Sequence, residues 1–405
     1  MDCIRGFKKN LILLRYARTP ALQALPLTAQ CFLHTTLLHE KLTFHNGRYI
    51  ISTFFPPLPS RAYEEMTKST LATYRKDPYP YSAYCALTNR CSFSCWHCSK
   101  DLRGGQELST GDWQQVMRSL QDKGVSLIGF TGGEPLFRGD LEQILEAIDE
   151  RSAKILFTTG DGLTRTRCQS LKKSGLDYVA ISLDSCDEKE HNRLRGKDNA
   201  FQVAMASIQH SLEAGFYTAV QTVPRKEMLA KSYMNRFVRF VHELGVHEIR
   251  FIEPMPTGKL LEGSAGVLFS DEDRRKLRQY HIEVNRRKTH PKVASFAYVE
   301  DKSLYGCGAG IQHLYIDASG NLCPCDFTPL SFGNVAQEGF ETAYEKIRTC
   351  FTHPYDSCFI QKNYSLVKAK CKGRLPLDGK DSAAVCRESP RTPLPRFYRW
   401  LGWRD

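Results

Sequence analysis

Three cysteines in the segment CSFSCWHC, at positions 91, 95 and 98, have a spacing that points to metal chemistry. A structural zinc ion and a fully ligated iron–sulfur cube each take four protein ligands. Thiolates at Cys91, Cys95 and Cys98 can instead hold one face of a [4Fe–4S] cube and leave one iron open to a small molecule. The alternatives are a zinc site that borrows His97 or a distant cysteine, and three buried free thiols.

The segment that must position this loop alternates short β-like runs with helical stretches. Six β-like runs are present, and each but the last is followed by a helix; the runs are 84–88, 125–130, 153–159, 177–184, 216–223 and 247–254. Several of the helices end at a glycine before the next run. Such alternation requires right-handed crossovers and a parallel sheet. We therefore expect an α/β fold in which the cysteine loop follows the first strand.

Length and composition fit one large α/β barrel with appended units. The 405 residues are 41% hydrophobic and 25% charged, as in an ordinary folded protein. The net charge of +12 suits an anionic substrate, a membrane surface or nucleic acid without choosing among them. Fifteen scattered cysteines, an odd number, favour metal ligation over disulfides. The chain shows neither a secretory signal nor an apolar run of roughly 18 residues, so we expect a cytoplasmic protein.

We divide the chain into four parts. Residues 1–78 form a basic, aromatic N-terminal extension, in which we expect an opening amphipathic helix and a hairpin at Asn46-Gly47. Residues 79–265 hold the alternating strands and helices, and residues 266–390 hold seven of the fifteen cysteines. Residues 391–405 form a basic, aromatic tail, which either packs against the extension or makes a peripheral membrane contact.

Over roughly residues 80–260, the chain resembles the radical S-adenosylmethionine (radical SAM) enzymes. CSFSCWHC is similar to their cluster loop, and FTGGEP at 130–135 is similar to the motif whose backbone binds the methionyl amine of SAM. A simple turn between strand and helix is the alternative for FTGGEP. SLD at 182–184 resembles the strand that contacts the ribose. HNRLRG at 191–196 resembles the segment whose arginine meets the SAM carboxylate, and FIEPMPTG at 251–258 resembles the segment along the adenine.

The SAM-binding residues that this resemblance implies lie at the ends of the second and fourth strands and in HNRLRG: Gly132, Gly133, Glu134, Ser182, Asp184 and Arg195. We expect Glu134 and Asp184 to be binding or structural groups. The chain departs from the family where Thr158-Thr159-Gly160 replaces a common TNG turn, so an asparagine contact is absent there. A second departure is QTVPRKE after the fifth strand, where an asparagine is commoner.

The resemblance also implies a fold and a reaction. The fold is a partial (β/α)6 barrel in which Cys91, Cys95 and Cys98 hold a [4Fe–4S] cluster and SAM chelates the fourth iron. One electron, from a donor such as flavodoxin or ferredoxin, cleaves SAM to a 5′-deoxyadenosyl radical. The radical then abstracts hydrogen from a peptide or small-molecule substrate. Because this step needs no general base, we assign no catalytic residue.

The C-terminal cysteines resemble the opening of a SPASM or shorter twitch extension of these enzymes, which binds auxiliary iron–sulfur clusters. Cys307 and Cys325 flank a hairpin-like YIDASGNL with Gly320 at its turn. Candidate ligands further along are Cys358, Cys371 and Cys386. Because the dense cysteine run of a full SPASM extension is missing, we expect one auxiliary [4Fe–4S] cluster, held by Cys307, Cys325 and two of these three. Cys323 is the alternative to Cys325, and zinc or free thiols are the alternative to the cluster.

The other cysteines lack ligand spacing, and we expect them to be packed thiols: Cys3, Cys31, Cys85, Cys168, Cys186 and Cys350. The alternative function is a non-catalytic zinc or iron–sulfur protein with a structural, regulatory or RNA-binding role. No aromatic strand of the RNA-recognition type and no appended RNA module occurs, so a nucleic-acid partner is not expected.

Overall fold

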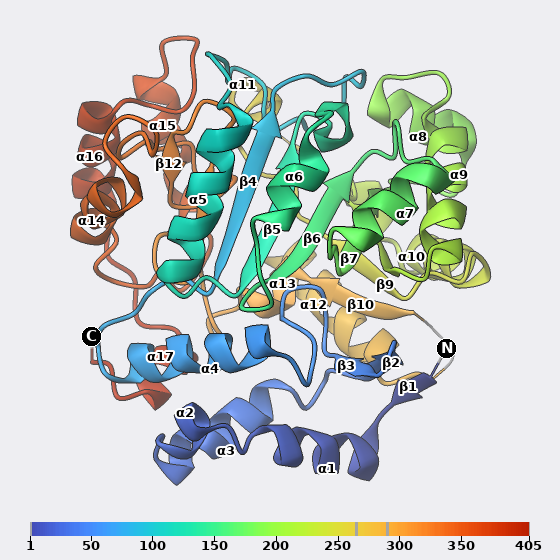
Figure 1. Ribbon diagram of the computed structural model, residues 1–405, viewed down its shortest axis with the longest axis horizontal. Coiled ribbons are helices and arrows are strands. Elements are labelled where there is room, and N and C mark those ends of the chain that lie inside the picture. The colour runs from blue at the N-terminus through green and yellow to red at the C-terminus, as the bar shows by residue number, and fades with distance from the viewer. Residues whose placement is uncertain (1, 264–265, 289–290, 405) are drawn as a thin grey trace.

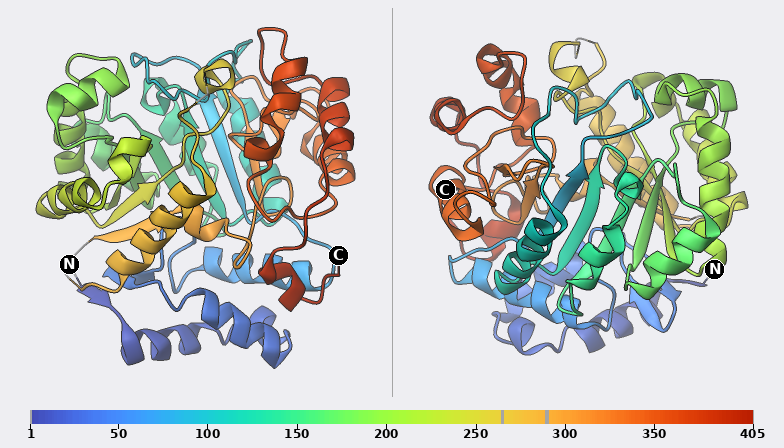
Figure 2. Two further views of the ribbon diagram at one scale, coloured as in Figure 1. Left: turned by 180° about the vertical axis from the view of Figure 1, so that it is seen from behind. Right: turned by 45° about the horizontal axis from the view of Figure 1, so that its top comes forward.

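The computed structural model describes residues 2–263, 266–288 and 291–404. A twisted, mostly parallel sheet forms its centre, and helices cover the outer side of the sheet (Figure 1). The N-terminal extension lies beneath one end of the strands, and the C-terminal cysteine-rich segment covers one side (Figures 1 and 2). None of the helices in these ranges is both long and apolar enough to cross a membrane.

The main sheet has nine strands in the order β10-β9-β8-β7-β6-β5-β4-β11-β12. Its six central strands are parallel: β4 (Ser82–Thr88), β5 (Leu127–Gly132), β6 (Ala153–Thr158), β7 (Tyr178–Ser182), β8 (Tyr217–Thr222) and β9 (Glu248–Phe251). The helices between them are α5 (Thr110–Asp122), α6 (Leu141–Glu146), α7 (Arg165–Lys173), α8 (Glu188–Arg195), α9 (Ala200–Glu213) and α10 (Lys231–Glu243), with short 3-10 turns η1 (Pro135–Phe137) and η2 (Lys226–Leu229). The predicted α/β partial barrel is therefore confirmed.

Two further parallel strands extend this sheet: β10, which the sequence analysis did not predict, and β11, whose hairpin was predicted but whose pairing with β4 was not. After α11 (Lys259–Glu262) and α12 (Asp271–Asn285), β10 (Lys292–Ser295) pairs with β9. After α13 (Phe296–Val299), β11 (His313–Ile316) pairs with β4 and begins the expected hairpin to β12 (Leu322–Cys323). The C-terminal helices are α14 (Phe340–Cys350), α15 (Phe359–Lys370), α16 (Gly379–Glu388) and α17 (Arg396–Trp400).

Both faces of the central strands are buried, which explains their apolar sequences. All seven residues of β4 are buried. Cys85 and Leu87 face the helix layer, where they share a core with Trp113, whereas Tyr84 and Ala86 face the barrel interior. Successive residues of a strand point to opposite faces, so a strand covered on both sides is apolar throughout.

The N-terminal extension closes the lower end of the barrel. Its elements are β1 (Asp2–Ile4), α1 (Gly6–Tyr16), α2 (Pro20–Gln23), α3 (Leu27–Thr36), β2 (Leu42–His45), β3 (Arg48–Ile50) and α4 (Arg61–Tyr74). β2 and β3 form the expected hairpin at Asn46-Gly47. Thr53 donates from its amide (3.1 Å) and its hydroxyl (2.5 Å) to Glu248, and its hydroxyl accepts from Arg250 at 2.5 Å. These buried bonds join the extension to β9.

The C-terminal tail also packs on the extension, as one of the two alternatives predicted. Phe397, Tyr398 and Leu401 are buried. The Trp400 ring stacks on Phe32 at 5.3 Å, and Trp403 Nε1 donates to the Thr73 carbonyl at 2.9 Å. This packing gives the alternative membrane contact of the tail no support.

Replacing Thr53 with valine tests whether the extension stabilises the barrel. The Thr53→Val change removes one hydroxyl bond to Glu248 and one from Arg250, and both charged partners are buried. We expect a loss of about 1–3 kcal/mol in unfolding free energy, because buried charged groups that lose a hydrogen bond carry a cost of that order. Urea unfolding measures it. Thr349→Val, at an exposed helical position, should change stability by less than about 0.5 kcal/mol; equal effects of the two changes would contradict the role of Thr53.

Candidate functional site

The candidate site lies where the carboxyl ends of the parallel strands meet, along the upper edge of the sheet in Figure 1. The cysteine loop follows β4, Gly132 ends β5 and Gly133 follows it, and Ser182 ends β7 two residues before Asp184. Arg195 is the last residue of α8. Ligands of open parallel sheets bind at this edge, so the fold places the predicted residues where chemistry is expected.

The three cysteines of the loop converge in one small apolar cluster. Cys91, Cys95 and Cys98 pack with Phe93 and with Ala200 of α9. Burial raises the pKa of Cys91 to about 11, and burial together with Cys95 also raises that of Cys98. Metal binding would remove the protons of Cys91 and Cys98, because a metal ligand must be a thiolate. Three converging cysteines of one loop, Cys95 buried and the other two half-buried, therefore fit an iron–sulfur cluster.

Three glycines from distant parts of the barrel touch the backbone of this loop. A Cβ on Gly133 would lie 2.1 Å from the Arg90 carbonyl, one on Gly196 2.5 Å from the Ser94 carbonyl, and one on Gly258 2.2 Å from the Cys98 carbonyl. Only glycine permits such approaches. Hydrogen bonds reinforce them: the amide of Gly133 donates to the Thr88 carbonyl at 2.7 Å, and Glu134 N donates to the Arg90 carbonyl at 2.7 Å.

The Glu134 carboxylate ties β5 to β6 and is fully buried. It accepts from the Thr158 hydroxyl (2.7 Å) and from both the amide (2.7 Å) and hydroxyl (2.5 Å) of Thr159. Burial raises the pKa of Glu134 to about 7. Thr158-Thr159-Gly160, which stands where the family commonly has a TNG turn, thus has a structural role, because the two threonine hydroxyls donate to the Glu134 carboxylate.

A buried ion pair joins α8 to the segment after β7. Arg195 Nε lies 2.8 Å from Asp184 Oδ2, and Arg195 Nη2 donates to Asp184 Oδ1 at 3.0 Å. Burial alone would raise the pKa of Asp184, but the Arg195 guanidinium outweighs it and holds that pKa well below its usual range. Arg195 Nη1 also lies 3.7 Å from Cys95 Sγ. A fixed positive charge therefore faces the thiols, as an anionic cluster would require.

The C-terminal cysteines separate into groups. Cys358 shares a hydrogen bond with Cys307, and Cys325 is close enough to Cys358 for its charge to raise the pKa of Cys325. Cys386 instead contacts Cys350, which sequence reasoning treated as a packed thiol. The predicted Cys307, Cys325 and Cys358 therefore come together, whereas Cys386 belongs to a different contact.

The remaining C-terminal candidates lie apart from the three gathered thiols. Cys371 Sγ lies 3.7 Å from the Arg374 carbonyl. Cys323 is buried on β12, in the same core cluster as Tyr84 and Ala86 of the barrel interior, with Arg103 Nη1 at 4.0 Å. Sequence reasoning also missed His313 and Asp326, which lie beside Cys325. The one sequence signal for this grouping is that Asp326 and His313 lie close to Cys325 along the chain.

Two family models match the chain. Residues 86–227 match the radical SAM superfamily, and residues 307–371 match SPASM, an iron–sulfur cluster-binding domain. An AdoMet-dependent heme synthase of Oleidesulfovibrio alaskensis is 24% identical over 337 residues, which cover 75% of this chain and 86% of that protein.

Solved structures share the fold. SuiB of Streptococcus suis, bound to its precursor peptide SuiA, has a TM-score of 0.57 at 18% identity and covers 77% of this chain and 79% of its own. The protein anSMEcpe, with bound AdoMet and the peptide Cp18Cys, has a TM-score of 0.55 at 18% identity and covers 80% and 95%.

Replacing Gly133 with alanine tests the close contact between β5 and the cysteine loop. The new Cβ meets a backbone carbonyl that cannot move without moving Cys91. We expect a destabilisation of about 1–3 kcal/mol, typical of overpacking, and less iron per chain after anaerobic purification. Thermal unfolding and iron analysis measure the two effects. Gly139→Ala is the control, since its Cβ meets nothing within 4 Å; full iron content and unchanged stability in Gly133→Ala would show that the contact is dispensable.

Proposed function

We propose, since the chain is a radical SAM enzyme that carries a SPASM domain, that Cys91, Cys95 and Cys98 hold its SAM-cleaving [4Fe–4S] cluster. The observation that carries this proposal is the convergence of these three thiols beside Arg195 at the carboxyl edge of the sheet. When bound, the cluster and SAM supply reductive cleavage of SAM and removal of a hydrogen atom from the substrate. Radical SAM catalysis replaces the non-catalytic alternative.

The protein's own residues bind and orient the two cofactors in this proposal. The amides of Gly133 and Glu134 are bonded to the Thr88 and Arg90 carbonyls, so we assign the amine of SAM to backbone carbonyls at Gly132-Gly133. Ser182, Asp184 and Arg195 lie on the same edge, for the ribose and the carboxylate of SAM. We assign Glu134 to holding Thr158-Thr159 rather than to direct contact with SAM, because those residues donate to both its oxygens.

The SPASM domain adds auxiliary iron–sulfur binding, for which we propose Cys307, Cys325 and Cys358 as ligands. We also keep as proposals the division at residues 78, 265 and 390, a cytoplasmic location, and a one-electron donor such as flavodoxin or ferredoxin. The net charge of +12 favours an acidic donor surface.

Replacing Cys91, Cys95 and Cys98 together with alanine tests the cluster assignment. Without these thiolates the cluster that presents an open iron to SAM cannot bind. Production of 5′-deoxyadenosine by the dithionite-reduced protein should therefore fall to background. Liquid chromatography of the nucleoside measures it, and circular dichroism checks the fold. Cys168→Ala, a buried thiol on α7, is the matched control and should retain the activity. Undiminished SAM cleavage in the triple variant would refute the assignment.

For the substrate we propose a peptide. Its support is that SuiB and anSMEcpe, whose fold this chain shares over 77% and 80% of its length, were each solved with a bound peptide. A small molecule is the second candidate, because the heme synthase relative matches 75% of the chain.

Deuterium transfer separates the two substrate classes. A perdeuterated cell lysate is divided by ultrafiltration into a peptide and protein fraction and a small-metabolite fraction, and each is added to reduced enzyme with SAM. Hydrogen removed from the substrate appears in 5′-deoxyadenosine, so mass spectrometry should find deuterium with the first fraction. Deuterium only with the metabolite fraction would overturn the peptide proposal and leave the SAM chemistry intact.

A further inference from the structure

The auxiliary site is one cysteine short of a fully ligated cube. Cys307, Cys325 and Cys358 lie together, but Cys386 contacts Cys350 and Cys371 lies against the Arg374 carbonyl. An iron–sulfur cube takes four protein ligands when none of its irons is left open. Within the described part of the chain, the thiols at this site supply three.

His313 and Asp326 lie beside these thiols. A ring nitrogen of His313, the Cys325 sulfur and a carboxylate oxygen of Asp326 are all within 4.8 Å of one another. Asp326 Oδ1 lies 3.3 Å from His313 Nε2 and 3.3 Å from Cys325 Sγ. Imidazole, thiolate and carboxylate are all metal ligands, and separations of this size allow them to share one metal centre.

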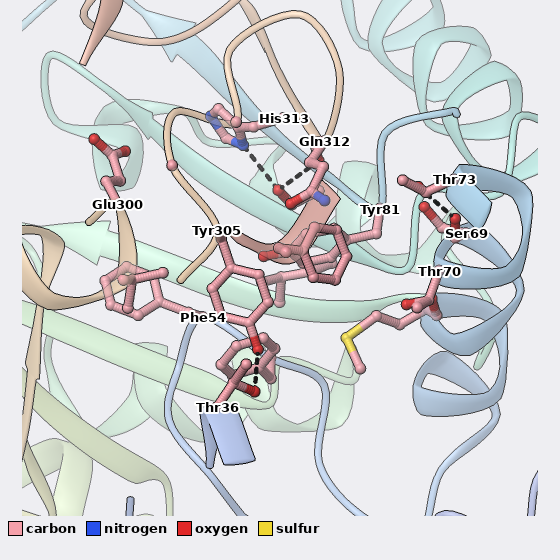
Figure 3. Close-up of a pocket in the computed structure, with 18 of the residues that line it drawn as sticks. Thr36, Phe54, Ser69, Thr70, Thr73, Tyr81, Glu300, Tyr305, Gln312 and His313 are labelled. Atoms are coloured by element: carbon pink, nitrogen blue, oxygen red, sulfur yellow. Dashed lines mark hydrogen bonds between the residues drawn. The ribbon is translucent and has the colours of Figure 1, made fainter. Parts of the chain in front are cut away.

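The position of the His313 ring is fixed by the first strand of the barrel. β11 pairs with β4 so that His313 stands opposite Ser82, and His313 Nδ1 lies 2.9 Å from Ser82 Oγ. The Tyr84 ring packs edge-on against the imidazole at 4.6 Å. Figure 3 shows His313 at the edge of a cavity of about 180 Å³, which Cys325 and Asp326 also line. A metal-binding histidine is held in this way, with one nitrogen on a partner and the other directed to the metal. In His313 the second nitrogen, Nε2, contacts Asp326 Oδ1 at 3.3 Å.

Charge favours the imidazole over the carboxylate as the ligand. The Asp326 carboxylate lies 3.3 Å from Cys325 Sγ, and the Glu300 carboxyl lines the same cavity. Three thiolates already place negative charge here, and a neutral imidazole adds a ligand without adding more.

We propose that His313 Nε2 is the fourth protein ligand of the auxiliary cluster, beside Cys307, Cys325 and Cys358. This inference rests on the proposed function, because it requires that the SPASM domain of this chain binds a cluster.

The test uses the full chain with Cys91, Cys95 and Cys98 replaced by alanine, so that only auxiliary iron remains. The protein is labelled with nitrogen-15 histidine, reduced, and studied by pulsed electron paramagnetic resonance. We expect strong magnetic coupling between the reduced auxiliary cluster and a histidine nitrogen. In His313→Cys, iron should be retained, the coupling lost and the reduction potential lowered, because thiolate replaces imidazole. If His313→Cys does not retain iron, Ser82→Ala serves instead: it frees Nδ1 and should shift the coupling.

Further variants show whether the His313 ligand or the auxiliary cluster itself is wrong. His353→Cys changes a half-buried histidine that bonds to the Thr392 carbonyl, and it should keep the coupling. A cluster without nitrogen coupling would overturn this inference alone. Loss of the cluster in Asp326→Asn with an unaltered signal in His313→Cys would make Asp326 the ligand and also overturn it. Absence of iron from the triple alanine variant would overturn the auxiliary cluster itself, while SAM cleavage by the wild type would still stand.

Discussion

The geometry of the cysteine loop depends on a close backbone contact with three glycines that are far apart in the sequence. Gly133 follows β5, Gly196 ends α8, and Gly258 precedes α11, and each would clash with a loop carbonyl if it carried a Cβ. The loop itself contains no regular helix or strand. Its shape is therefore imposed by the folded barrel, and the three thiols reach their positions only when the segments that follow β5, α8 and β9 are in place.

Charge acts on the site through pairs that are built before any cofactor binds. Arg195 is buried, and Asp184 compensates its charge through two contacts. The third side of the guanidinium faces Cys95. A buried charge without a partner destabilises the fold. The pairing with Asp184 therefore allows the Arg195 cation to lie beside the thiols. Glu134 uses a similar arrangement, since three donors of Thr158-Thr159 hold it between two strands.

The motifs could be predicted from the sequence because each has a local physical role. FTGGEP, HNRLRG and FIEPMPTG were identified as SAM-binding segments by resemblance, and each also contains one of the glycines that touch the loop. The six central strands were predictable because burial on both faces makes them continuous apolar runs.

Other features depended on contacts between distant residues. β10 begins with Lys292, a residue that sequence patterns do not place in a buried strand; its ammonium group donates to the Ile50 carbonyl of the N-terminal extension at 2.5 Å. Cys350 and Cys386 meet because α14 and α16 pack together, and no spacing rule relates two cysteines on separate helices.

The first strand also links the two metal-binding regions: β4 leads into the cysteine loop at one end, and Ser82 meets His313 at the other. Six residue steps of a strand span about 20 Å. A single rigid strand, buried on both faces, thus fixes the separation of the two regions, so neither can shift along the barrel without breaking the pairing of β4 with β5 or β11.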